Sequence, residues 1–116
     1  MRPNIWPTHL HEAPVWIVPC LEGASPTRTA GSSIYPAVQN MLLAARALGL
    51  GATLTTLYLS FEKEVEAAID LPSDVHSYAL LPIGYPMGRF GPVRRVPLGE
   101  VVYEDRWGQP MSEWGD

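Results

Sequence analysis

The sequence "IYPAVQNMLLAARALGLG", residues 34–51, predicts a long helix around which the rest of the chain is arranged. Apolar residues recur along it at steps of three and four, which is helical spacing: Val38, Met41, Leu42, Ala45 and Leu48. Ser33 is the expected N-cap, and Pro36 then falls near the first turn, where a missing N–H costs nothing. A glycine at 49 or 51 is expected to end the helix.

Polar residues are rare in this helix, since only Gln39, Asn40 and Arg46 interrupt its apolar surface. A helix that is apolar on nearly all faces is typical of a buried position. We therefore expect helix 34–48 to be central and buried.

Shorter elements are expected on both sides of the helix. Apolar and β-branched runs predict strands near 13–20, 52–58 and 77–84. An amphipathic pattern predicts a short helix over 60–71, with Ser60 as its N-cap and Phe61 and Ile69 on its inner face. The fold class expected from this order is α+β, with helices and strands packed in layers.

Length and composition limit the kind of protein. The chain has 116 residues, a formal net charge of −4 and one cysteine, which predict a single domain, 1–116, in a reducing compartment. Neither a signal peptide nor a membrane span is expected, and the acidic balance argues against nucleic-acid binding. A cytoplasmic protein is therefore the expectation.

Prolines are concentrated at the two ends of the chain, and their total of twelve is about twice the usual frequency. Segments 1–12 and 104–116 are therefore expected to be extended arms. Such arms could lie along a second subunit.

Clustered arginines stand out in "YPMGRFGPVRRVPLGE", residues 85–100. Arg89, Arg94 and Arg95 fall within seven residues of an acidic chain, between glycines and prolines that exclude a helix. A guanidinium group binds phosphate through two parallel hydrogen bonds, so a phosphorylated ligand is one interpretation. A solubilising surface loop is the other, and the residues alone leave both open.

No catalytic or metal-binding motif accompanies this loop. His9 and His11 are two residues apart beside Glu12, but His76 lies far along the chain, and no metal-ligand spacing joins them. Cys20 is expected to be a buried, unreactive thiol. The acidic residues of segment 60–71 are expected to form a solvated helix face: Glu62, Glu64, Glu66 and Asp70.

Three segments, in this order, resemble the second half of an FMN-dependent nitroreductase: "SSIYPAVQNMLLAARALGLGATLTTL", "YALLPIGYPMGRFGPVRRVPLGEVV" and "EDRWG". The resemblance runs from about Ala13 to Gly108. It implies a truncated nitroreductase-like α/β/α sandwich. It also implies that the family's N-terminal half, with its arginine-rich phosphate-binding segment, is absent from this chain.

The resemblance also implies a cofactor site. Arg95 occupies the position that reaches the FMN phosphate, and Arg94 and then Arg89 are further candidates. Thr55, Thr56 and Leu57 match the stretch whose backbone contacts the N5/O4 edge of the flavin, where N–H groups stabilise the charge of the reduced ring.

The activity implied is that of an NAD(P)H oxidoreductase. Hydride passes from NAD(P)H to FMN, and a nitroaromatic, quinone or similar acceptor then takes the electrons in a ping-pong reaction that needs no side-chain acid or base. Family members are homodimers, with the long helix between subunits. A non-catalytic shortened domain, acting as a dimeric structural or binding module, is the alternative. A third possibility is a module that binds another phosphorylated small molecule through the arginines.

Overall fold

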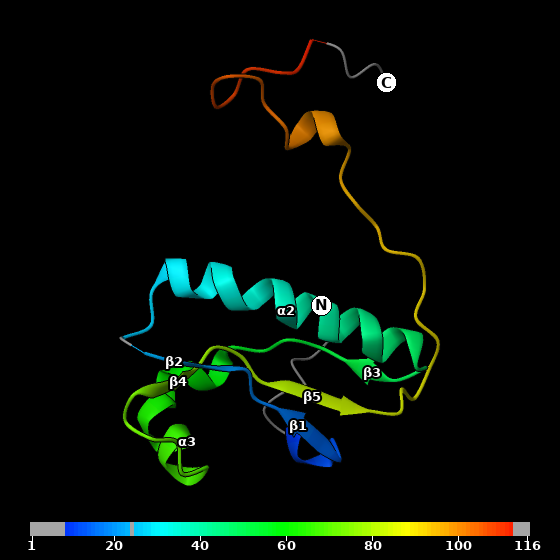
Figure 1. Ribbon diagram of the computed structural model, residues 1–116. Helices are drawn as coiled ribbons and strands as arrows, with labels where there is room; N and C mark the ends of the chain where they lie inside the picture. Colours follow the sequence, from blue (N-terminus) through cyan, green and yellow to red (C-terminus); the bar gives the residue numbers. More distant parts are fainter. Residues whose placement is uncertain (1–8, 24, 113–116) are drawn as a thin grey trace.

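The computed structural model describes residues 9–23 and 25–112 as a mixture of short strands and helices (Figure 1). Three antiparallel strands form one sheet, in the order β1 (Val15–Ile17), β5 (Leu81–Gly84) and β3 (Gly51–Ala52). Two more form an antiparallel pair, β2 (Cys20–Glu22) and β4 (Val75–Ser77). The predicted combination of helices and strands is therefore confirmed.

Helices α2 and α3 lie on different sides of the strands (Figure 1). The long helix α2 (Arg28–Ala47) runs across one face, and α3 (Glu62–Ala68) lies below the β2–β4 pair. Short 3-10 turns complete the elements: η1 (Leu10–Glu12), η2 (Leu57–Phe61) and η3 (Leu98–Glu100). The core joins α2 to the chain around β5 through Ile34, Val38, Tyr78, Ala79 and Leu81.

Helix α2 begins six residues before the predicted start, so the choice of Ser33 as N-cap is wrong. Thr27 caps the helix instead, because its side-chain oxygen accepts a hydrogen bond of 3.1 Å from the Ala30 N–H. Pro36 consequently lies inside the helix, where it removes one backbone hydrogen bond. Of the residues in the turns before Ser33, Gly31 is buried, so the longer helix packs against the body there.

The end of α2 agrees with the prediction. Gly49 adopts a left-handed backbone with φ of +77°, while Leu50 N–H donates to Ala45 C=O and Gly49 N–H donates to Arg46 C=O. These two bonds form a Schellman motif, which glycine favours because it has no Cβ.

Burial of α2 is restricted to one face, so the expectation of a wholly buried helix is wrong for this single chain. Val38 is 1% exposed, whereas Leu43 is 58% exposed and Leu48 is 76% exposed. Only one layer of strands lies against the helix, and its other apolar face contacts solvent.

Each predicted strand is shorter than expected, and two of them are divided. The segment 13–20 forms β1 and the start of β2, because Pro19 lies between them and its C=O accepts from Tyr78 N–H. The segment 77–84 likewise contains the end of β4 and all of β5, which pair with different partners. In 52–58 only Ala52 belongs to a strand, and an isolated bridge at Thr55 follows.

The second predicted helix, 60–71, is only partly correct. The chain forms η2 and then α3, whose N-cap is Phe61 rather than Ser60, and α3 ends at Ala68. Phe61 is 64% exposed and Ile69 is 46% exposed, so neither forms the inner face that was predicted.

A long arm leaves the body after β5 and runs past the end of α2 (Figure 1). The radius of gyration is 18.0 Å, whereas a compact chain of this length has a value of roughly 13 Å. The arm starts well before the predicted C-terminal arm, 104–116. Parts of both predicted arms lie outside the described residues: residues 1–8 of the arm at 1–12, and residues 113–116 of the arm at 104–116. Within the described part of the chain, no helix is long and apolar enough to cross a membrane.

Candidate functional site

A surface cavity of about 280 Å³ lies along the segment between β3 and η2. Five consecutive residues line it: Thr53, Leu54, Thr55, Thr56 and Leu57. The structure thus brings together the three residues that were predicted for the flavin edge. Thr53 and Leu54 were missed, although both lie in the matching segment of the sequence.

Hydrogen bonds hold this segment in place chiefly through Thr55. Thr55 N–H donates to Leu80 C=O at 3.0 Å, and Leu80 N–H donates back to Thr55 C=O at 2.9 Å. Leu57 N–H donates to the Thr55 hydroxyl at 3.3 Å. Among the described residues, Thr56 N–H has no partner. The N–H groups of Thr53 and Leu54 likewise have no partner among the described residues, so Thr56 is one of three donors available to a ligand.

The three arginines lie on the arm and outside this cavity. Arg89, Arg94 and Arg95 are exposed, and none of them forms an ion pair with a residue in 9–23 or 25–112. None lines the cavity at 53–57. A single chain therefore does not bring the arginine loop and the predicted flavin edge together.

The root of the arm, in contrast, is attached to the body. The guanidinium carbon of Arg46 on α2 lies 4.7 Å from the centre of the Phe90 ring, which is a cation–π contact. Phe90 and Pro86 also lie against Gly51, within contact distance of the position that a Cβ there would take. The arm therefore contacts the body as far along the chain as Phe90. Arg94 and Arg95 come after this last contact.

A second polar network joins α3 to β4. The Glu66 carboxylate accepts hydrogen bonds from the Ser77 N–H at 2.8 Å and the Ser77 hydroxyl at 3.0 Å. The Ser77 hydroxyl in turn accepts one from Tyr58 at 3.0 Å. Burial works against ionisation of Glu66, but the bonds from Ser77 outweigh it and hold the pKa of Glu66 below its usual value. Glu66 is therefore not part of a solvated helix face, contrary to the sequence-based prediction.

Cys20 lies beside this network on β2, opposite Ser77. Its thiol donates to Val18 C=O at 3.3 Å and is half-buried. Burial and the nearby charge of Glu66 raise the pKa of the Cys20 thiol above its ordinary value of 9.0. A thiol with a raised pKa carries little of the reactive thiolate at neutral pH.

Comparison with known proteins identifies relatives of one family. The family model "Nitroreductase family" matches residues 2–85. A protein of Methanothermobacter thermautotrophicus, named "Putative NADH dehydrogenase/NAD(P)H nitroreductase", is 37% identical over an alignment of 102 residues that covers 83% of this chain and 52% of that protein.

Solved structures give the same result. A crystal structure from Parabacteroides distasonis with that same name superimposes with a TM-score of 0.68 and 28% identity, over 79% of this chain and 55% of the other. Iodotyrosine deiodinase bound to FMN and 3-iodo-L-tyrosine superimposes with a TM-score of 0.59 and 31% identity, over 82% of this chain and 48% of the other. The predicted nitroreductase-like fold is thus confirmed.

The family model covers the two predicted parts of the site differently. This chain spans about half the length of the relatives it matches. The cavity at 53–57 lies inside the range matched by the family model, whereas Arg89, Arg94 and Arg95 lie beyond residue 85, where that match ends.

Proposed function

Because the chain belongs to the nitroreductase family, we propose that it forms part of an FMN-dependent oxidoreductase. The observation that carries this proposal is the cavity at 53–57, whose wall includes the unpaired N–H of Thr56. The structural relative iodotyrosine deiodinase binds FMN, which supports the same cofactor here.

The chain's own residues fit one edge of a flavin. A donor N–H in a fixed backbone suits an electronegative ring edge, and it stabilises negative charge without rearrangement when the ring is reduced. Pairing with Leu80 fixes the position of Thr55 and so holds the neighbouring Thr56 in place. The aliphatic side chains of Leu54 and Leu57 supply an apolar surface beside this donor.

The cavity is too small to enclose the whole cofactor. Its volume of about 280 Å³ lies at the lower limit of ligand pockets, which range over about 300–1,000 Å³. Further walls, and the groups that bind the phosphate, must come from elsewhere. In this proposal Arg95, assisted by Arg94 and Arg89, binds the phosphate when the arm is in its assembled position.

Assembly with a second copy is the second part of the proposal. Apolar side chains on the outer face of α2 and along the arm are exposed in one chain: Met41, Leu43, Leu48, Met87, Val93, Val96, Val101 and Trp107. Solvent exposure of this many large apolar groups is typical of an interface that forms in the assembled protein. A homodimer with α2 at its centre covers the helix and gives the arm a surface to lie on.

The reaction proposed follows from these parts. When bound, FMN supplies the redox chemistry, with hydride received from NAD(P)H and electrons passed to a nitroaromatic, quinone or similar acceptor in ping-pong order. The protein's contribution is to orient the ring edge at Thr56 and to neutralise the phosphate with arginine. A side-chain acid or base is not required.

The cytoplasmic location expected from the sequence stays a prediction.

The experiment that tests the cofactor site is an FMN titration of the full chain and of Arg95→Ala, followed by flavin fluorescence. Loss of a charge-assisted pair removes about 1.5–3 kcal/mol, so affinity should fall by about 10- to 150-fold. Arg106→Ala is the matched control, because it removes the same charge from the same arm. Equal weakening in the two variants would place the phosphate elsewhere.

A non-catalytic shortened domain remains the second candidate. It is favoured by the separation of the arginines from the cavity within one chain. A chain that forms dimers but binds no FMN would support this candidate against the first.

A further inference from the structure

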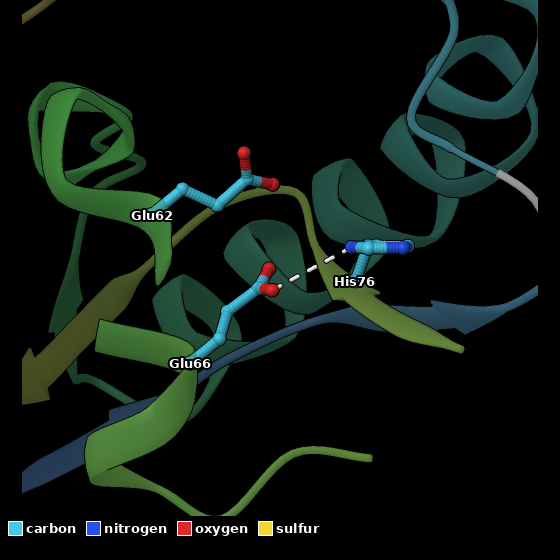
Figure 2. Close-up of side chains that lie close together, drawn as sticks. All are labelled: Glu62, Glu66 and His76. Carbon is cyan, nitrogen blue, oxygen red and sulfur yellow. Dashed lines mark ion pairs between the residues drawn. The ribbon is translucent and has the colours of Figure 1, made fainter. Parts of the chain in front are cut away.

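Three side chains that commonly bind metals converge between α3 and β4 (Figure 2). Glu62 and Glu66 lie four residues apart on α3, so both point to the same side of the helix. His76 faces them from β4. One ligand atom from each of the three lies within 4.8 Å of the others, and Glu66 Oε2 is 3.5 Å from His76 Nδ1.

The orientation of Glu66 is fixed by neighbouring groups. Its Oε1 accepts both hydrogen bonds from Ser77, a residue that is 1% exposed. The hydroxyl of Tyr58 donates to Ser77 and completes the chain of hydrogen bonds. Oε2 is left facing His76. Hydrogen-bonded supports of this kind hold a carboxylate ligand in place in metal sites.

The charges at the cluster are unbalanced. Two carboxylates meet one imidazole, and neither glutamate forms an ion pair with a lysine or arginine of the described residues. The Glu66 and His76 side chains are 14% and 24% exposed, so water screens the two negative charges only partly. A cation bound between them would compensate both.

We propose that Glu62, Glu66 and His76 bind one divalent transition-metal ion, and that zinc fits them best. An imidazole ligand favours zinc over calcium or magnesium, which prefer oxygen ligands alone. Ligands on a tetrahedral zinc ion lie about 3.3 Å apart, given bond lengths of 2.0–2.2 Å. The ligand atoms, which now lie within 4.8 Å of one another, must therefore approach by about 1.5 Å to bind the ion. Rotation of a flexible side chain such as Glu62 allows this.

The residues around the cluster indicate how the metal ion reaches it and what the ion does there. Glu62 and Ser77 also line a larger surface cavity of about 500 Å³, beside the N-terminal turns of α2, which gives the ion a route from solvent and a water as its fourth ligand. The ion would tie α3 to β4. The cluster shares no residue with the cavity at 53–57, so this inference is independent of the flavin.

The test is calorimetric titration of Zn²⁺ into the full chain, without added flavin, and into Glu62→Gln and His76→Gln. Two variants serve as matched controls. Glu64→Gln changes an exposed glutamate on the same helix. His9→Gln changes the histidine of a separate His–Glu pair, in which His9 Nδ1 lies 2.8 Å from Glu12 Oε1.

We expect one zinc ion per chain, with affinity at least about tenfold weaker in Glu62→Gln and in His76→Gln and unchanged in both controls. Absence of zinc binding by the unmodified chain, or equal affinity in all variants, would overturn the proposal. Nuclear magnetic resonance of the unmodified chain gives a second readout if a variant fails to fold. Zinc must then shift the ring signals of His76, and a shift confined to His9 or His11 would equally overturn it.

Discussion

Truncation of Leu43 on the outer face of α2 should weaken the proposed dimer without affecting the folded chain. Leu43 is 58% exposed and lies outside the core cluster. Complete burial of a leucine is worth about 1.5–3 kcal/mol, so covering the exposed part contributes about 1 kcal/mol per copy. A twofold dimer contains two copies, and Leu43→Ala should therefore cost about 2 kcal/mol, or about 30-fold in the dimer dissociation constant.

Sedimentation equilibrium measures this constant directly, and urea denaturation checks that the free energy of unfolding of the chain is unchanged. Ile69→Ala is the matched control, because Ile69 is 46% exposed but follows α3 on another part of the molecule. A dissociation constant that changes equally in both variants would refute the placement of α2 at the interface. So would an unmodified chain that stays monomeric.

Three further predictions concern the folded chain. Leu81→Ala should lower the free energy of unfolding by about 3 kcal/mol in urea denaturation, because Leu81 is 0% exposed in the central strand; a loss below about 1 kcal/mol would contradict the assigned core. Gly84→Ala should cost about 1–2 kcal/mol in the same assay, since its Cβ would lie 3.1 Å from the rigid Pro14 ring; unchanged stability would mean that β1 moves away freely. For Cys20, the rate of reaction with a thiol reagent should rise with pH through a midpoint above 9.0, because burial and Glu66 raise its pKa in the folded state. Glu66→Gln should lower that midpoint, and a native midpoint below 9.0 would argue against the raised pKa.

The sequence pattern predicted the long helix correctly where only one interpretation of the pattern was available. Spacing of apolar residues located the body of α2, and Gly49 gave its end because a left-handed residue there favours glycine. The start was missed because both Thr27 and Ser33 are suitable caps. Thr27 is the cap in the structure, and burial of Gly31 in the turns before Ser33 depends on the surrounding fold, which no local pattern contains.

Strand boundaries depended on partners that are distant in the sequence. The run from 77 to 84 appears continuous, but Ser77 pairs with Cys20 while Leu81 pairs with Ile17. The change of partner between them divides the run into β4 and β5. Apolar character alone does not specify which strand lies alongside.

The candidate sites show the same limit. Thr55, Thr56 and Leu57 were predicted from family resemblance, and they line one cavity because they are consecutive in the sequence. The cluster of Glu66 with His76 was missed because it depends on β4 lying beside α3. The spacing of Glu62 and Glu66 by four residues was the only local sign of it.

The most direct test of the proposed function is the visible absorbance of the purified full chain after incubation with excess FMN and desalting. We expect the chain to retain about one flavin per copy, and NADH or NADPH to bleach its absorbance. A chain that elutes colourless, while remaining folded by circular dichroism, would contradict the proposal that these residues form a flavin site.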